Sequence, residues 1–224
     1  MAKTALIIGA SRGLGLGLVR RFREQHWEVV ATCRDERGAQ ALGAVDGVQV
    51  EHVDICAPAS REALAGRLEG RSFDLVFVNA GIPGPAHRQV GAATAEEAGT
   101  LFLTNAIAPV QMAERLLARL APDGVLGFMS SVMGSVELAQ AQHRLYGASK
   151  AALNHLVHSL WAGLGETGLT LLCLHPGWVQ TDMGGAEAPL DVATSTEGVC
   201  RVLAEASGRG GVHFIDYRGQ ALPW

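Results

Sequence analysis

A tyrosine and a lysine four residues apart, Tyr146 and Lys150, are the side chains of this chain best placed to do chemistry. On a helix, residues four apart lie on one face, so the ammonium would lie close to the phenol. A free tyrosine has a pKa near ~10, and a neighbouring cation lowers that value. A shift of ~2–3 units corresponds to roughly 3–4 kcal/mol of favourable interaction with the phenolate. The pair therefore predicts a tyrosine that exchanges a proton with a substrate.

A glycine-rich turn near the start of the chain predicts a phosphate-binding loop. It reads Gly9-Ala-Ser-Arg-Gly13-Leu-Gly15 and lies between an expected strand and an expected helix. Glycines let the backbone approach a pyrophosphate closely, and the helix N-terminus offers N–H donors. The spacing is G-x-x-x-G-x-G and not G-x-G-x-x-G, so a purely structural turn is the alternative. The residues expected to bind a dinucleotide here are Gly9, Ser11, Arg12, Gly13, Leu14 and Gly15.

The end of the second expected strand indicates which dinucleotide would bind. NAD sites usually place a carboxylate there, but Cys33 occupies that position and Arg34 follows it. Arg12 projects from the glycine loop nearby, and two guanidinium groups suit a 2′-phosphate. The sequence therefore favours NADP(H) over NAD(H). If the strand ended one or two residues later, Asp35 would serve as the ribose acid, which leaves NAD use open.

Strands and helices alternate along the chain, which predicts an α/β fold. The expected strands are residues 5–8, 29–33, 48–53, 75–78, 125–129, 169–174 and 212–215, and the expected helices are 14–25, 61–68, 94–120, 146–164 and 195–206. Near-continuous apolar strands are typical of a parallel sheet covered on both faces. We expect one Rossmann-type, doubly wound dinucleotide-binding domain over residues 1–224, with about seven parallel strands and helices on both faces.

Two segments predict local irregularities. Thr94 and Glu97 have the form of a capping box at the start of a long helix. Pro109 interrupts that helix and predicts a bend just after Asn105. Residues 183–196 are rich in glycine and alanine and lack periodicity, so we expect a mobile loop over the site, with a plain surface excursion as the alternative.

Composition excludes several classes of protein. The net charge is −4 and no basic block exists, so neither nucleic acid nor an anionic membrane is an expected partner. No run approaches the ~20 apolar residues of a membrane helix. The four cysteines, Cys33, Cys56, Cys173 and Cys200, are widely spaced and lack metal-ligand spacing, so we expect buried thiols and no metal. A soluble cytoplasmic protein is expected.

Together these motifs resemble the short-chain dehydrogenase/reductase family from Lys3 to about Asp182. The resemblance implies three residues at the reacting group, Tyr146, Lys150 and Ser131, the last being the second serine of Ser130-Ser131-Val-Met-Gly134. It also implies that Asn105 holds a water for proton relay. The interval from Ser131 to Tyr146 is about two residues longer than is common, which leaves Ser130 and Ser135 as alternatives.

The same resemblance implies further cofactor contacts. It places Asp54 and Ile55 at the adenine and Asn79-Ala80-Gly81 at the turn after the fourth strand. It places Pro176, Gly177, Val179 and Thr181 at the nicotinamide, and it adds Tyr146 and Lys150 to the cofactor contacts. Two departures from the family pattern are Ile8 and Val78, which stand where a threonine and an asparagine are usual.

Within the family, the short length and the stretch from His175 to Gly185 are similar to the C-factor and sniffer type of carbonyl reductase. This implies an NADPH-dependent reductase that moves a hydride between nicotinamide and a small aldehyde or ketone. The alternative is a non-catalytic NADP-binding signalling or regulatory protein on the same fold. The resemblance also implies a homodimer or homotetramer.

The expected pocket walls are mostly apolar, which predicts a mostly neutral substrate. Arg144 is the one candidate for binding an anionic group, should it point inward. The residues expected to line the pocket are Met133, Gln140, His143, Leu145, Trp178 and Met183.

Overall fold

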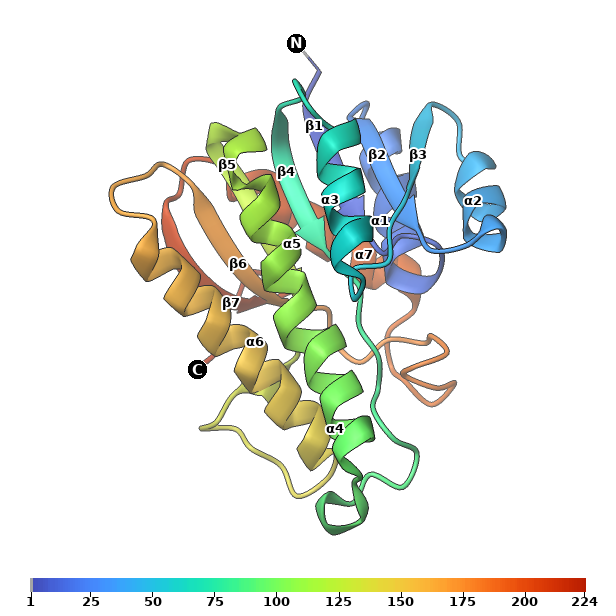
Figure 1. Ribbon diagram of the computed structural model, residues 1–224, viewed down its shortest axis with the longest axis vertical. Helices are drawn as coiled ribbons and strands as arrows, with labels where there is room; N and C mark the ends of the chain where they lie inside the picture. Colours follow the sequence, from blue (N-terminus) through green and yellow to red (C-terminus); the bar gives the residue numbers. More distant parts are fainter. Residues whose placement is uncertain (1) are drawn as a thin grey trace.

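The strands form one seven-stranded parallel sheet in the order β3-β2-β1-β4-β5-β6-β7 (Figure 1). The computed structural model describes residues 2–224. The strand order reverses between β1 and β4, and open sheets of this kind bind ligands outside the carboxyl ends of the strands at such a point. The strands are β1 Thr4–Ile8, β2 Glu28–Cys33, β3 Val48–His52, β4 Phe73–Val78, β5 Leu120–Met129, β6 Thr170–His175 and β7 Gly211–Asp216.

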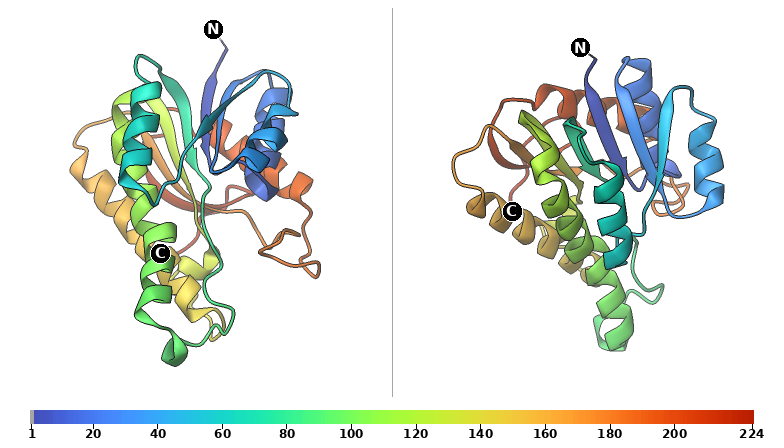
Figure 2. Two further views of the ribbon diagram at one scale, coloured as in Figure 1. Left: turned by 45° about the vertical axis from the view of Figure 1, so that its right-hand side comes forward. Right: turned by 45° about the horizontal axis from the view of Figure 1, so that its top comes forward.

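Helices cover both faces of the sheet (Figure 2). One apolar core joins the sheet to α3, α5 and α6, and a second joins it to α1, α2 and α7. Successive strand residues point to opposite faces, so Leu6 and Ile8 belong to the first core while Ala5 and Ile7 belong to the second. The helices are α1 Gly13–Glu24, α2 Glu36–Gly43, α3 Pro58–Arg67, α4 Ala95–Phe102, α5 Ala108–Leu116, α6 Arg144–Gly163 and α7 Val192–Glu205.

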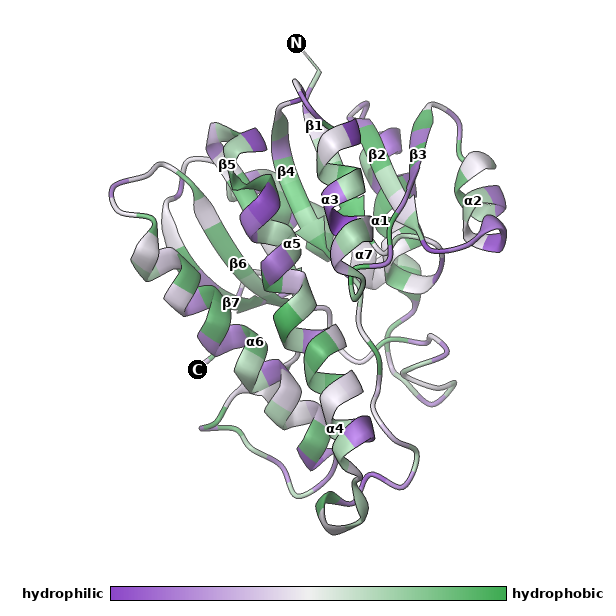
Figure 3. Ribbon diagram, in the orientation of Figure 1, coloured by the Kyte–Doolittle hydropathy of each residue, from purple (hydrophilic) through white to green (hydrophobic). Residues whose placement is uncertain are grey.

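The hydropathy of the chain follows this layering (Figure 3). The central strands are hydrophobic along their length, because both of their faces are covered. The helices carry hydrophilic residues mainly on the side away from the sheet. The expected α/β fold with a parallel sheet of seven strands is therefore confirmed.

The long helix expected over residues 94–120 is divided at the position that the sequence indicates. Thr94 and Glu97 form the capping box of α4, and a π-helical turn, Leu103–Ile107, separates α4 from α5. Pro109 has no N–H to donate to the carbonyl of Asn105, four residues earlier, so regular α-helical bonding cannot pass this point. Asn105 lies inside the π-helical turn and is fully buried.

The sequence-based prediction differs from the structure most clearly in three places. Helix α2 was not expected; its N-terminus is capped by Asp35, whose Oδ1 accepts from the Gly38 amide at 2.8 Å. Strand β5 begins at Leu120, where the long helix was expected to end. Residues 192–196 belong to α7 and not to a loop, because Asp191 accepts from the Thr194 amide and caps the helix there.

Two glycine variants test how far the site depends on backbone geometry. Gly9 has φ 81°, and a Cβ there would lie 2.9 Å from Ala80. Gly9→Ala should therefore lower the free energy of unfolding by about 1–3 kcal/mol. Gly99, exposed inside α4 with open space around it, is the matched control. Gly99→Ala should raise the same quantity by about 0.5–1 kcal/mol. Urea denaturation measures both, and equal effects would contradict the strain at Gly9.

Candidate active site

Tyr146 and Lys150 lie on the first turns of α6, as their spacing predicts. Lys150 is buried, with 3% of its surface exposed, and Tyr146 is partly buried. The Nζ atom of Lys150 lies 5.8 Å from the centre of the Tyr146 ring. It also donates to the carbonyl oxygen of Met129 at 2.8 Å, at the carboxyl end of β5. The lysine is therefore fixed between the sheet and the tyrosine.

Ser131 reaches Tyr146 because the loop after β5 packs closely against α6. A Cβ on Gly134 would lie 2.9 Å from the backbone of Lys150, and one on Gly147 would lie 2.8 Å from the carbonyl oxygen of Met133. Larger residues at either glycine would push the loop away from the helix. Ser131 is buried, its Oγ accepts from the Met133 amide at 3.2 Å, and its side chain is close enough to the phenol of Tyr146 to affect the Tyr146 pKa.

The two alternative serines have other partners. Ser130 Oγ donates to Asn154 Oδ1 at 2.6 Å inside the protein. Ser135 Oγ accepts from the Leu138 amide at 3.0 Å. Of the three serines, Ser131 is the one whose side chain affects the pKa of Tyr146.

Asn105 connects three parts of the site. Its Oδ1 accepts from the Ile82 amide at 2.8 Å, and its Nδ2 donates to the Ile82 carbonyl at 2.9 Å and to Ser149 Oγ at 3.0 Å. Its Oδ1 and the Nζ of Lys150 both lie within 3.4 Å of the point where a Cβ on Gly81 would stand. The π-helical turn, the loop after β4 and α6 thus meet at one buried amide.

The direction of the Tyr146 pKa corrects the sequence-based expectation. Burial raises the pKa of Tyr146 to about 12, and the hydrogen bond with Ser131 opposes that rise. Burial also lowers the pKa of Lys150 to about 8. Loss of hydration therefore decides the direction of the shift, and the expected lowering of the Tyr146 pKa by Lys150 was wrong.

The glycine loop lies beside the cluster of Tyr146, Lys150, Ser131 and Asn105, at the point where the strand order reverses between β1 and β4. Asn79 Nδ2 donates to the carbonyl of Gly9 at 2.7 Å, which joins the loops after β4 and β1. Ala80 packs against Gly9, and Gly13 takes φ 53° at the start of α1. Arg12 is strongly exposed and forms an ion pair with Asp182, which comes from the loop after β6. Leu14 and Gly15 follow in the first turn of α1, whose N-terminus carries no side-chain cap.

The end of β2 fits a phosphorylated ribose better than a free diol. β2 ends at Cys33, as expected, and Arg34 is exposed after it. Asp35, the candidate ribose acid, uses its Oδ1 to cap α2. The first residue after β2 therefore offers a guanidinium group, and the carboxylate that follows it is engaged in helix capping.

The remaining expected cofactor residues occupy the same edge of the sheet. Asp54 is exposed after β3 and accepts from the Cys56 amide at 2.9 Å, while Ile55 beside it is buried. The segment after β6 begins with Pro176, whose carbonyl accepts from Ser195 at 2.7 Å, and Gly177 with φ 85°. The segment continues through Val179, which is buried, and Thr181, which is partly buried.

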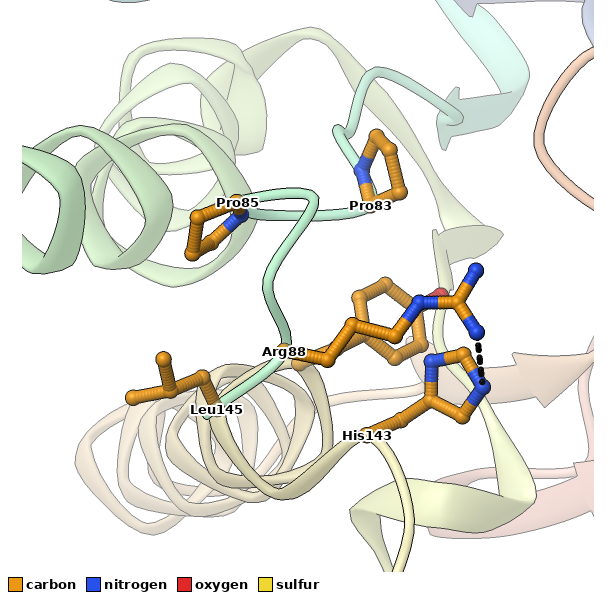
Figure 4. Close-up of a pocket in the computed structure, with 6 residues that line it drawn as sticks. Pro83, Pro85, Arg88, His143 and Leu145 are labelled. Atoms are coloured by element: carbon orange, nitrogen blue, oxygen red, sulfur yellow. Dashed lines mark hydrogen bonds between the residues drawn. The ribbon is translucent and has the colours of Figure 1, made fainter. Parts of the chain in front are cut away.

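A small cavity of about 10 Å³ opens beside Tyr146 (Figure 4). His143 and Leu145 line it, as predicted. The other wall was not predicted from the sequence; it comes from the segment after β4 and includes Pro83, Pro85 and Arg88. A wider hollow of about 300 Å³ shares Arg88 with it and is also lined by Arg144. The other expected wall residues, Met133, Gln140, Trp178 and Met183, line neither space.

Two other features are absent from residues 2–224. No helix in that part of the chain is both long and apolar enough to cross a bilayer. No group of three or more histidine, cysteine or acidic side chains there is arranged to hold a metal ion.

Residues 3–189 match the family model described as short chain dehydrogenase. The chain belongs to this family. It is thus an oxidoreductase of the short-chain dehydrogenase/reductase type. Among curated relatives, the C-signal protein of Myxococcus xanthus is 33% identical over 154 residues, which is 67% of this chain and 92% of that protein.

Solved structures of this family superpose over the whole chain. A short-chain dehydrogenase/reductase from Burkholderia multivorans with bound NADP is 39% identical, with a TM-score of 0.95 and full coverage of both chains. A carbonyl reductase from Pseudomonas aeruginosa PAO1 in complex with NADP is 43% identical, with a TM-score of 0.92 and full coverage of both chains. The carbonyl reductase Sniffer of D. melanogaster is 29% identical, with a TM-score of 0.88 and full coverage of both.

The burial of Lys150 predicts how the free energy of unfolding depends on pH. In the folded protein the pKa of Lys150 is about 8, against ~10.4 for an unfolded lysine. Between these values the unfolded state binds more protons, so the lysine makes stability rise with pH. From pH 8 to 10 the wild type should gain roughly 2–3 kcal/mol of unfolding free energy relative to Lys150→Met.

Chemical denaturation at several pH values measures this gain. Lys3, the other lysine of the chain, is exposed and provides the control. Lys3→Met should follow the wild-type pH profile. Parallel profiles for Lys150→Met and the wild type would contradict a buried, charged Lys150.

Proposed function

We propose that this protein is an NADPH-dependent reductase that moves a hydride between nicotinamide and small, mostly neutral aldehydes or ketones. The observation that supports it most is the meeting of Tyr146, Ser131, Lys150 and Asn105 at the carboxyl edge of the sheet, beside the glycine loop. The two NADP-bound structures that superpose on the whole chain support the choice of cofactor.

The cofactor would lie along the carboxyl edge of the sheet. The glycine loop and the open N-terminus of α1 would hold the pyrophosphate. Arg12 and Arg34 would bind the 2′-phosphate, which requires Arg12 to leave Asp182. The adenine would meet Asp54 and Ile55, and the nicotinamide end would meet residues 79–81 and 176–181. When bound, NADPH supplies the hydride, and its oxidised form adds a positive charge to the site.

The chain's own residues handle the proton. Tyr146, neutral at pH 7 with a pKa of about 12, is a donor to the carbonyl oxygen and acts as general acid. Ser131 donates a hydrogen bond to the same oxygen, where negative charge develops. Lys150, largely charged at pH 7, stabilises the phenolate that remains and binds the nicotinamide ribose. Asn105 holds a water through which Lys150 exchanges protons with solvent.

Broader features of the protein are part of the same proposal. The chain is a single oxidoreductase domain over residues 1–224 that acts as a homodimer or homotetramer. All four cysteines are unpaired, three of them buried, which supports a reducing compartment such as the cytoplasm.

Tyr146→Phe tests the proton-transfer role. The variant keeps the ring and removes the proton, so carbonyl-dependent NADPH oxidation should fall roughly 10²–10⁴-fold in kcat while NADPH still binds. Tyr217, the only other tyrosine, provides the control, since its hydroxyl accepts from Arg218. Tyr217→Phe should retain its rate. If the wild type binds NADPH but consumes none with a broad carbonyl panel, the non-catalytic alternative is supported instead.

Arg34→Ala and Arg12→Ala test the cofactor preference. Each removes a charged donor to the 2′-phosphate and should weaken NADPH binding roughly 10- to 100-fold, with NADH binding nearly unchanged. Nucleotide fluorescence titration measures both affinities. Arg20, exposed on α1, gives the control variant Arg20→Ala, which should change neither. Equal losses for the two nucleotides would contradict a 2′-phosphate site.

A further inference from the structure

Two residues in strained backbone conformations face each other at the cavity beside Tyr146. Arg88 has φ 56° and His143 has φ 54°, and among residues 2–224 only His26 is a third non-glycine residue with positive φ. Such conformations are uncommon for residues with side chains, and they cluster at functional sites. Arg88 lies in the segment after β4 and His143 precedes α6, so two distant parts of the chain are strained where they meet.

The two side chains point toward each other across the cavity (Figure 4). Arg88 Nη1 lies 3.3 Å from His143 Nε2. Burial and the charge of Arg88 lower the pKa of His143, so at neutral pH the imidazole is uncharged and can accept from the guanidinium. This contact uses one of the five N–H donors of the arginine and leaves its charge uncompensated.

The wider hollow that shares Arg88 contains a second arginine and no carboxylate. Its other lining residues are Gln89, Val90, Gly91, Ala141 and Arg144. Arg144 Nε donates to the carbonyl of Ala141 at 3.0 Å. Among the ion pairs of residues 2–224, none includes Arg88 or Arg144. Two guanidinium groups thus border one hollow in a protein whose net charge is −4.

The start of α6 adds to this positive potential. Its N-cap residue, His143, makes no side-chain capping bond, and its first turn contains no acidic residue. The free N–H groups and the helix dipole at such an end favour a negative charge. A nearby acid, Glu97, is already bound by Thr94 and His87.

The sizes of the two spaces indicate how a substrate would lie. The cavity beside Tyr146, at about 10 Å³, has room for little more than a water-sized group. The hollow between Arg88 and Arg144, at about 300 Å³, has room for the body of a small molecule. A carbonyl group entering the first space would leave the rest of the substrate beside the two arginines.

We propose that Arg88 and Arg144 bind a carboxylate at the end of the substrate remote from its reacting carbonyl. The preferred substrates are then small aldehydes or ketones that carry one negative charge. This rests on the proposed reductase function and replaces its mostly neutral substrates by anionic ones: the reacting end of the substrate is uncharged and meets Pro83, Pro85 and Leu145, whereas the far end is anionic. The strained pairing of Arg88 with His143 holds the guanidinium at the entrance.

A matched pair of substrates tests this. 4-Carboxybenzaldehyde and its methyl ester differ mainly in charge at the far end. With NADPH, the wild type should show a kcat/KM roughly tenfold or more higher for the acid. Arg88→Asn removes the charge and tolerates the left-handed backbone. It should lower kcat/KM for the acid roughly 10- to 100-fold and change the ester less than about threefold. Arg144→Gln should act in the same direction.

Benzoate gives a second measurement that does not need turnover of the acid. It should inhibit ester reduction by the wild type, and Arg88→Asn should lose that inhibition. Arg20→Gln, outside the hollow, is the control and should behave as the wild type. Equal kcat/KM for acid and ester in the wild type would overturn the carboxylate site and leave the proposed reductase function intact. Turnover of neither compound, with NADPH bound, would overturn both.

Discussion

A buried ammonium is the constraint on which the rest of the site depends. Lys150 has lost its hydration, and its one protein partner is the carbonyl of Met129. A buried charge costs free energy unless neighbouring groups compensate it. Burial accordingly lowers the pKa of Lys150 to about 8. The same burial raises the pKa of Tyr146 to about 12. Burial thus disfavours the charged forms of both side chains, the ammonium of Lys150 and the phenolate of Tyr146.

The sequence predicted the scaffold well because its signals are local. Apolar strands, the capping box at Thr94 and the effect of Pro109 each depend on neighbours within a few residues. Helix α2 was not predicted because it is short and lies at the surface. Only Gly38 and Leu42 are buried, so the sequence shows no helical period of apolar residues there. Its start depends on Asp35, which the sequence analysis considered only as an alternative ligand for ribose.

The site was predictable where motifs fix it and not where tertiary contacts do. Tyr146 and Lys150 could be chosen from their spacing, and Ser131 and Asn105 from the resemblance to the family, and the structure brings the four together. Arg88 could not be found this way, since it belongs to an irregular segment with no period or motif, and only the fold carries it to His143. The direction of the Tyr146 pKa also required the fold, because desolvation depends on how the whole chain packs.

Proton transfer and substrate recognition depend on different parts of the chain. At Gly134 and Gly147 the loop after β5 packs closely against α6. Ser131, Tyr146 and Lys150 lie on these two closely packed segments. The residues that would meet the rest of a substrate come instead from the irregular segments around positions 83–91 and 141–145. Mutations in those segments would change the substrate specificity and leave Ser131, Tyr146 and Lys150 in place. We therefore expect relatives of this chain to differ most in these segments. The same segments are the first choice for engineering the specificity.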